Sequence, residues 1–183
     1  MTDDFPYSSR RAALSDLGEL QSVMEQSINR LLDPFLSPEQ VKASHEIMGL
    51  DSRLVEDGTY FVLQSGIEII GCGGWSRRET LYGGNHTKGR NDRLLDPETE
   101  PARVRAMYTR PDHVRRGVGR KILDLCESDA AHEGFTRFQL MATLSGEPLY
   151  RACGYQALEN CAAETSSGIT VPLILMEKPA SAR

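Results

Sequence analysis

The chain has 183 residues, of which 39% are hydrophobic and 26% charged, and its formal net charge is −5. This length and composition suit one globular domain with a sizeable core and exclude a disordered or fibrous chain. The negative balance argues against a broad nucleic-acid-binding surface, so we expect any basic site to be local.

Targeting signals and cysteine usage point to the cytoplasm. The first residues, MTDDFPYSSRR, are acidic and polar and lack the apolar run of a signal peptide. No stretch approaches the length of a membrane span. The cysteines show no CxxC spacing, and no His or Cys forms a metal-ligand pair at helical spacing. We therefore expect a cytoplasmic protein with reduced thiols, no metal and no membrane contact.

The predicted elements start with a short strand at residues 8–14. An amphipathic helix follows, and Pro38 then opens a second helix at the tolerated first helical position. Residues 59–64 and 67–75 are rich in β-formers and flank a Ser-Gly turn, so they predict a hairpin. Three glycines in its second strand indicate a bulge or a close approach by another backbone or a ligand. These glycines are Gly71, Gly73 and Gly74.

A long loop and the second half of the fold come next. Residues 77–101 are rich in glycine and charge, which is typical of a functional or disordered segment. Pro172 indicates that part of the last strand lies at a sheet edge. The resulting order, β-α-α-β-β-β-α-β-α-β-β, predicts an α/β domain around one mixed sheet. The later elements are a strand at 102–110, a helix at 117–133, a strand at 135–142, a short helix at 148–153, and strands at 155–159 and 169–177.

The segment HVRRGVGRKILDLCE, residues 113–127, places arginines and glycines at the start of a helix. It is not a dinucleotide fingerprint, because Ile122 stands where the third glycine would be, and no Gly-Lys-Ser/Thr makes it a P-loop. Free N–H groups at a helix start attract a phosphate, and glycines let it approach the backbone. A plain turn with a solvated basic rim fits the glycine pair equally well.

The preceding strand favours the phosphate. Its expected core positions are Thr109, Met107 and Val104, and the step from Met107 to Val104 is three residues instead of two. A one-residue bulge explains this step and leaves backbone groups unpaired. Those groups can bind an extended, amide-bearing ligand as an added strand would be bound. A pyrophosphate joined to an amide-rich arm describes coenzyme A.

Two segments, VRAMYTRPDHVRRGVGRKIL (104–123) and PLYRACGY (148–155), together resemble the GNAT superfamily of N-acetyltransferases. The first is similar to the acetyl-CoA-binding motif of that family, and the second to the motif that follows it. The resemblance spans residues 8–178, between tails at 1–7 and 179–183. It implies the GNAT fold: a mixed, mostly antiparallel sheet flanked by helices, with a bulged strand at the CoA site.

The resemblance also implies roles for individual residues. Tyr150 would be the general acid that protonates the CoA thiolate, and the N–H of Met107 would stabilise the oxyanion. As a structural alternative, Tyr150 packs in the core with its hydroxyl capped. The expected CoA-binding residues, through their main chains for the most part, are Met107, Tyr108, Thr109, Val114, Arg115, Arg116, Gly117, Val118, Gly119 and Arg120.

The start of the long loop is expected to face the acceptor. Arginines there suggest an acceptor that carries a carboxylate or phosphate beside its amine, although a solvated loop face is an equal alternative. Glu147 and His86 are weaker candidates, with a helix-dipole charge and a surface-loop histidine as their structural interpretations. The expected acceptor-site residues are Trp75, Arg77, Arg78 and Tyr82.

Three departures from the family pattern limit what is carried over. Val114 stands where the family often has Gln or Arg, and LSGEP replaces a common Asn before the tyrosine motif. Arg103 occupies the position of the glutamate base of some histone-directed members, so no general base is assigned.

The sequence thus predicts an acetyl-CoA-dependent N-acetyltransferase in which a primary amine attacks the thioester directly in a ternary complex. The alternative is a non-catalytic acyl-CoA-binding or sensing module. A nucleotide hydrolase is disfavoured because no residues for Mg²⁺ are apparent. The acceptor could be a small-molecule amine or a protein amine, and a homodimer is left open.

Overall fold

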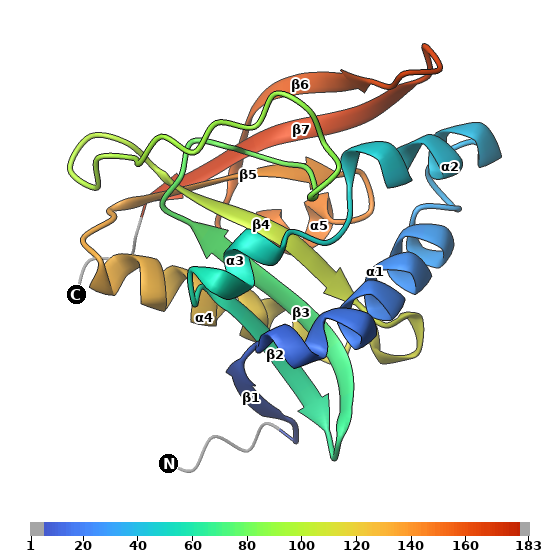
Figure 1. The fold of residues 1–183 in the computed structure, drawn as a ribbon. Helices are drawn as coiled ribbons and strands as arrows, with labels where there is room; N and C mark the ends of the chain where they lie inside the picture. Colours follow the sequence, from blue (N-terminus) through green and yellow to red (C-terminus); the bar gives the residue numbers. More distant parts are fainter. Residues whose placement is uncertain (1–5, 180–183) are drawn as a thin grey trace.

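The computed structural model describes residues 6–179, and its sheet has the strand order β1-β2-β3-β4-β5-β7-β6 (Figure 1). In chain order the elements are β1 (Ser8–Arg11), the 3₁₀ helix η1 (Leu14–Asp16), α1 (Leu17–Leu31), α2 (Pro38–Ile47), α3 (Ser52–Glu56), β2 (Tyr60–Ser65), β3 (Glu68–Ser76), β4 (Ala102–Thr109), the 3₁₀ helix η2 (Pro111–His113), α4 (Val118–His132), β5 (Arg137–Thr143), α5 (Glu147–Ala152), β6 (Gln156–Glu164) and β7 (Thr170–Pro179).

The sheet is mixed and mostly antiparallel, as the sequence predicts. Only β4 and β5 run parallel, and they pair only at Ala102 with Phe138 and at Arg103 with Gln139. Beyond Arg103 the two strands have no further paired residues. The sheet therefore opens between its two halves at the carboxyl ends of β4 and β5.

Two differences from the predicted elements have local causes. Helix α3 is missing from the prediction because five residues are too few to show a helical period, although Asp51 caps it by accepting the N–H of Arg53 at 3.2 Å. The last strand, β7, lies between β5 and β6. Its pairing with β5 begins at Leu173, so Pro172 has a partner strand on one side only, as predicted.

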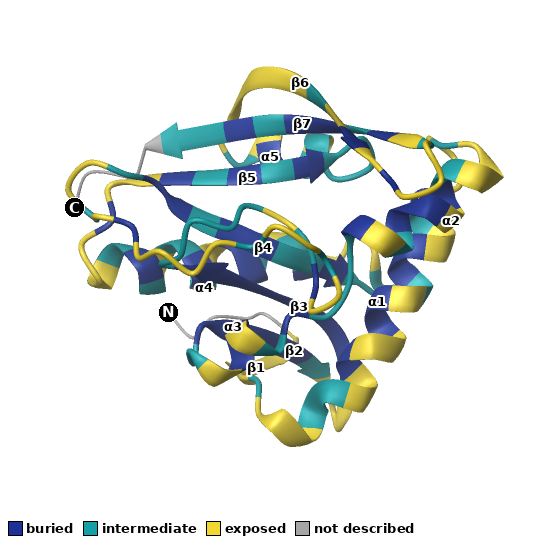
Figure 2. Cartoon of the chain, turned by 45° about the horizontal axis from the view of Figure 1, so that its top comes forward, coloured by how far each residue is buried: buried dark blue, intermediate teal, exposed yellow. Residues whose placement is uncertain are grey.

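Helices cover both faces of the sheet. Helices α1 and α3 pack on one face over a core that includes Leu20, Val62 and Cys72. Helix α4 packs on the other over a core that includes Ile122 and Trp75. Figure 2 shows the buried strands enclosed between these layers, with the exposed residues of the helices turned outward. The β6–β7 hairpin meets α2 in a third, smaller core.

The glycines of β3 allow α4 to lie close to the sheet. A Cβ on Gly71 would be 2.4 Å from Cγ1 of Val118, and one on Gly73 would be 2.7 Å from Cγ2 of Ile122. Both distances are shorter than side-chain contacts allow, so larger residues would push the start of α4 away. The close approach predicted at these glycines is made by side chains of α4, and it sets the position of the helix start described below.

Residues 6–179 contain neither a membrane-spanning helix nor a cluster of metal-binding side chains. No helix in this range is long and apolar enough to cross a membrane. The same range contains no group of three or more His, Cys, Asp or Glu side chains arranged to hold a metal ion.

Candidate functional site

The predicted bulge lies in β4 at Ala106 and Met107. Gly74 of β3 is opposite Arg105, and Cys72 is opposite Tyr108, so β4 has one residue more than β3 over this span. Ala106 takes a positive φ of 52°, an uncommon conformation for a residue with a side chain. Neither Ala106 nor Met107 has a register partner in β3 or β5. The extra residue confirms the interpretation of the three-residue step in the sequence.

The bulge is held in place by β2. The hydroxyl of Tyr60 donates a hydrogen bond of 2.7 Å to the carbonyl of Ala106. Because the bulge shifts the alternation, the side chain of Tyr108 is buried on the α1 face, where its hydroxyl accepts the N–H of Gly49 at 2.9 Å. Met107 and Thr109 are only half-buried, since they border the opening between β4 and β5.

A cavity of about 800 Å³ occupies this opening. Its walls come from β4, β5, the first turn of α4, α5, the end of α1 with the connection to α2, and the long loop. The basic residues on its walls are four arginines and a histidine, and no Asp or Glu of the described chain lines it. These basic residues are Arg30, Arg105, His113, Arg115 and Arg120.

The first turn of α4 presents free amides to the cavity. Gly117 has a φ of 80°, which favours glycine, and its carbonyl accepts the first helical hydrogen bond, from Lys121, at 3.0 Å. Within the described residues no protein group accepts from the N–H groups of Val118, Gly119 or Arg120. Unsatisfied amides and the helix dipole favour an anion here, as the sequence predicts.

All of the predicted CoA-binding residues line the cavity except Arg116, which is exposed. Gly119 also allows α5 to approach, because a Cβ there would be 2.8 Å from Cδ2 of Leu149. Arg120 reaches the end of α5, where its guanidinium donates to the carbonyl of Ala152 at 3.4 Å. The site therefore joins the start of α4, at Val118, to α5, which begins at Glu147.

Tyr150 lies on α5 and borders the same cavity, with 8% of its surface exposed. Its ring meets that of Tyr155 edge-on, with 5.9 Å between centroids. Its ring packs in the core, as the structural alternative expects, but among the described residues its hydroxyl has no hydrogen-bond partner and is not capped. Burial raises the pKa of Tyr150, so the phenol keeps its proton at neutral pH.

Of the four residues expected to face the acceptor, the structure places one on the cavity wall and three elsewhere. Tyr82 lines the cavity. Trp75 is fully buried over α4, and its indole N–H donates to Asp129 at 2.8 Å. Arg77 pairs with Glu133 and Arg78 with Asp57. Trp75, Arg77 and Arg78 do not border the cavity, because β3 carries them toward α3 and the end of α4, so we leave them out of the site.

The two weaker candidates, and Arg103 at the position of the family's glutamate base, make local contacts outside the cavity. Glu147 pairs with Arg151 one turn later, at 2.7 Å. A ring nitrogen of His86 lies 2.9 Å from the carbonyl of Glu46. Arg103 contacts Gln139 and the carbonyl of Glu79. None of the three lines the cavity.

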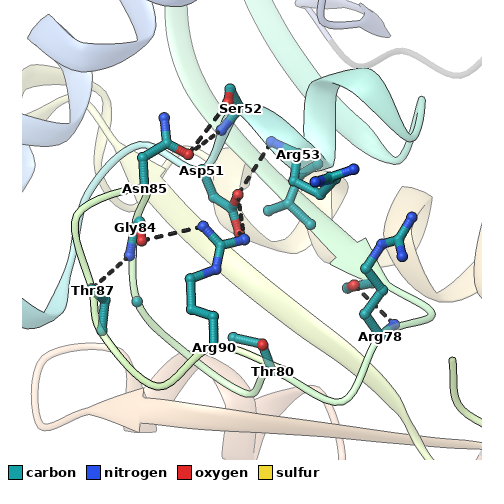
Figure 3. Close-up of polar contacts among 12 residues, drawn as sticks. Asp51, Ser52, Arg53, Arg78, Thr80, Gly84, Asn85, Thr87 and Arg90 are labelled. Atoms are coloured by element: carbon teal, nitrogen blue, oxygen red, sulfur yellow. Dashed lines mark hydrogen bonds and ion pairs between the residues drawn. The ribbon is translucent and has the colours of Figure 1, made fainter. Parts of the chain in front are cut away.

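Arg105, the buried arginine of the site, was not predicted from the sequence. Its Nη1 lies 2.7 Å from Oδ2 of Asp51, and its Nη2 donates to the carbonyl of Gly83 at 2.7 Å. Arg90 of the long loop binds both oxygens of the same carboxylate at 2.8 Å (Figure 3). A charged residue next to a core residue such as Val104 in a strand usually lies on the solvent-facing side of the sheet. No local signal therefore marked Arg105 as buried.

Comparisons with known proteins agree with this architecture. Residues 56–157 match the family described as acetyltransferase (GNAT) domain. No match was found among curated proteins.

Several solved structures share the fold at low identity. A GCN5-related N-acetyltransferase from Rhodopseudomonas palustris is 18% identical, with a TM-score of 0.71 and 98% of both chains covered. The PaiA N-acetyltransferase of Thermoplasma acidophilum, solved in complex with coenzyme A, is 14% identical, with a TM-score of 0.64 and 94% of this chain and 98% of that chain covered. The ribosomal-protein-S18-alanine N-acetyltransferase of Escherichia coli is 14% identical, with a TM-score of 0.58 and coverage of 97% and 96%.

Proposed function

The chain belongs to the GNAT acetyltransferase family, and from this we propose that it transfers an acetyl group from acetyl-CoA to a primary amine by direct attack in a ternary complex. Membership makes it an acyltransferase. The observation that carries the proposal is one cavity that joins an unpaired β4 bulge, the free amides of α4 and an unpartnered tyrosine hydroxyl. Each of these features meets one requirement of the reaction.

The walls of the cavity fit the two polar parts of acetyl-CoA. The N–H groups of Val118, Gly119 and Arg120 would bind the pyrophosphate, with Arg115 adding charge at the rim. The unpaired main chain of β4, at Met107 and toward Thr109, would bind the amides of the pantetheine arm as a neighbouring strand would. Acetyl-CoA supplies an acetyl thioester, which is open to attack by an amine.

Two groups of the chain would assist the transfer. The N–H of Met107 lies at the unpaired bulge and would stabilise negative charge that develops on the acetyl oxygen. Tyr150 would give its proton to the departing sulfur, and its raised pKa means that this proton is present at neutral pH.

The lining also favours the attacking form of the amine. Positive charges lower the pKa of a nearby ammonium, because they disfavour a second charge of the same sign. The four arginines of the cavity, of which Arg105 is paired with Asp51, would therefore favour the neutral amine, and no Asp or Glu of the described chain lines the cavity to oppose this. No carboxylate base is assigned in this proposal.

The test has two stages, both on the full-length protein. Coenzyme A should raise the melting temperature, since a ligand that binds only the folded state stabilises it. A panel of primary amines with acetyl-CoA should then include some that release CoA thiol. The absence of stabilisation by CoA would overturn the proposal, and stabilisation without turnover of any amine would leave the binding-module alternative.

A further inference from the structure

Arg105 is an unusual residue for the inner wall of a cavity. Its side chain is 2% exposed, and its guanidinium is held by Asp51 and by the carbonyl of Gly83. Of the three guanidinium nitrogens, only Nε has no hydrogen-bond partner among the described residues, and it is buried. Leaving a buried donor unpaired costs about 1–3 kcal/mol, and more on a charged group, so this N–H calls for a partner.

The carboxylate that pairs with Arg105 does not belong to it alone. Asp51, whose side chain is fully buried, also binds Arg90 through both oxygens and accepts the N–H of Arg53. The Arg90 guanidinium donates in addition to the carbonyl of Gly84 at 3.3 Å, as Figure 3 shows. One carboxylate thus faces two guanidiniums, and the cluster keeps one positive charge without a counter-ion.

The rest of the cavity does not supply this counter-ion. No Asp or Glu of residues 6–179 lines the cavity, although the whole chain has 26 acidic residues against 21 basic ones. Arg115 lies just before α4 and Arg120 in its first turn, where the pyrophosphate is proposed to bind, so the charges of these two arginines are matched there. Arg105 lies before the bulge and contacts Gly83 of the long loop, next to Tyr82. The excess charge of the Asp51 cluster is therefore on the loop side of the cavity, while the fourth arginine, Arg30, lies at the end of α1.

We propose that the acceptor is a primary amine that carries a carboxylate, and that Arg105 recognises this carboxylate through its free N–H and the unpaired charge of its cluster. This inference rests on the proposed acetyltransferase function and names its substrate class. A single carboxylate neutralises the single excess charge and satisfies the buried donor. The acceptor is thus of the amino-acid type, with a free carboxylate.

Two other classes of amine fit this wall poorly. A polyamine or an aminoglycoside would bring several positive charges to a wall that has no carboxylate to pair with them. A phosphorylated amine would carry about two negative charges, whereas the cluster has an excess of one positive charge.

The first experiment compares matched acceptors on the full-length protein. Thiol release from acetyl-CoA is measured with each common amino acid, with its α-carboxamide and with the amine that lacks the carboxyl group; spermidine and phosphoethanolamine complete the panel. We expect kcat/KM for the preferred amino acid to exceed that for its amide by about 10- to 100-fold, the usual effect of leaving a buried charged donor unpaired. Calorimetric titration of the same pairs into the CoA-saturated protein should give the same order of affinity.

The second experiment changes the arginine. Arg105→Lys keeps the charge beside Asp51 but removes the Nε donor, and it should raise KM for the amino acid while leaving CoA-induced stabilisation unchanged. The matched control is Arg137→Lys, because Arg137 also combines an ion pair, with Glu177, and a carbonyl acceptor, at Thr99, but lies outside the cavity. This control should keep the full preference for the acid over the amide.

The outcomes separate the inference from the function on which it rests. Equal turnover of acids and amides, or a preference for spermidine or phosphoethanolamine, would overturn the inference and leave the acetyltransferase in place. Turnover of no amine would reject the acetyltransferase and the inference with it. A full acid preference in Arg105→Lys would remove Arg105 from the recognition, and if that variant fails to fold, the wild-type pairs still decide the acceptor class.

Discussion

The ring of Tyr150 meets the ring of Tyr155 edge-on, with 5.9 Å between centroids and an interplanar angle of 64°. The two tyrosines differ in their hydroxyls. That of Tyr155 donates to Glu127 at 2.9 Å, whereas that of Tyr150 has no hydrogen-bond partner among the described residues. Packing therefore accounts for the ring of Tyr150 and leaves its hydroxyl available for chemistry.

Tyr150→Phe should lower kcat by about 10²- to 10⁴-fold, the usual contribution of a positioned general acid. The ring contact with Tyr155 is retained, so CoA-induced stabilisation and the melting temperature should stay near the wild-type values. Steady-state kinetics with saturating acetyl-CoA measure the first effect and thermal shift the second. A variant with wild-type kcat would show that another group protonates the thiolate.

Gly117→Ala should weaken CoA binding, because its φ of 80° would strain any residue with a Cβ and displace the free amides of α4. The matched control is Gly168→Ala in the β6–β7 turn, where φ is 76° and nothing lies within 4 Å of an added Cβ. Both variants should lose about 1–2 kcal/mol of folding free energy. Only Gly117→Ala should lose affinity for CoA in a calorimetric titration, and equal affinities would contradict the proposed pyrophosphate site.

Asp51→Asn should destabilise the protein by about 3–5 kcal/mol, since it leaves the guanidiniums of Arg90 and Arg105 without their shared carboxylate. Asp92→Asn is the control, because the side chain of Asp92 is 59% exposed and its carboxylate lies 3.8 Å from the Arg53 guanidinium, in a loose surface ion pair. That change should cost less than about 0.5 kcal/mol. Urea unfolding monitored by fluorescence measures both, and similar losses would show that the buried cluster contributes no more than a surface pair.

Asp57 should shape the loss of stability in acid. Its hydrogen bonds with Arg78 hold the pKa of Asp57 below its ordinary value of 3.8. A carboxyl whose pKa is lower in the folded state stabilises the protein above its unfolded pKa, and this stabilisation is lost as the pH falls through the folded pKa. Asp57→Asn should therefore be less stable than wild type at neutral pH, and the difference should shrink below about pH 4.

The measurement is the unfolding free energy in urea at a series of pH values from 7 to about 3. Asp33→Asn provides the control, since Asp33 is exposed and makes no ion pair or hydrogen bond within the described residues. This variant should follow the wild-type curve. A gap between wild type and Asp57→Asn that stays constant on acidification would contradict the assignment.

Much of the fold and the CoA side of the site could be predicted from the sequence, because the signals there are local. Glycines before a helix indicate free amides, and the three-residue step from Met107 to Val104 indicates a bulge. The loop side could not be predicted in the same way. Its walls combine the end of α1, the end of α2 and the long loop, and no spacing in the sequence relates Asp51 to Arg105.

The sequence by itself determined the order of the elements other than α3, the bulge and the glycine-rich helix start with free amides, since each depends on residues that are neighbours in the chain. Only the tertiary structure decided which arginine faces the loop side of the cavity. Arg77 and Arg78 each have a carboxylate partner and lie outside the cavity. Arg105 is buried on the cavity wall, and it shares the carboxylate of Asp51 with Arg90. The physical reason is that burial and charge pairing are long-range properties, set by how the loop folds back over the sheet.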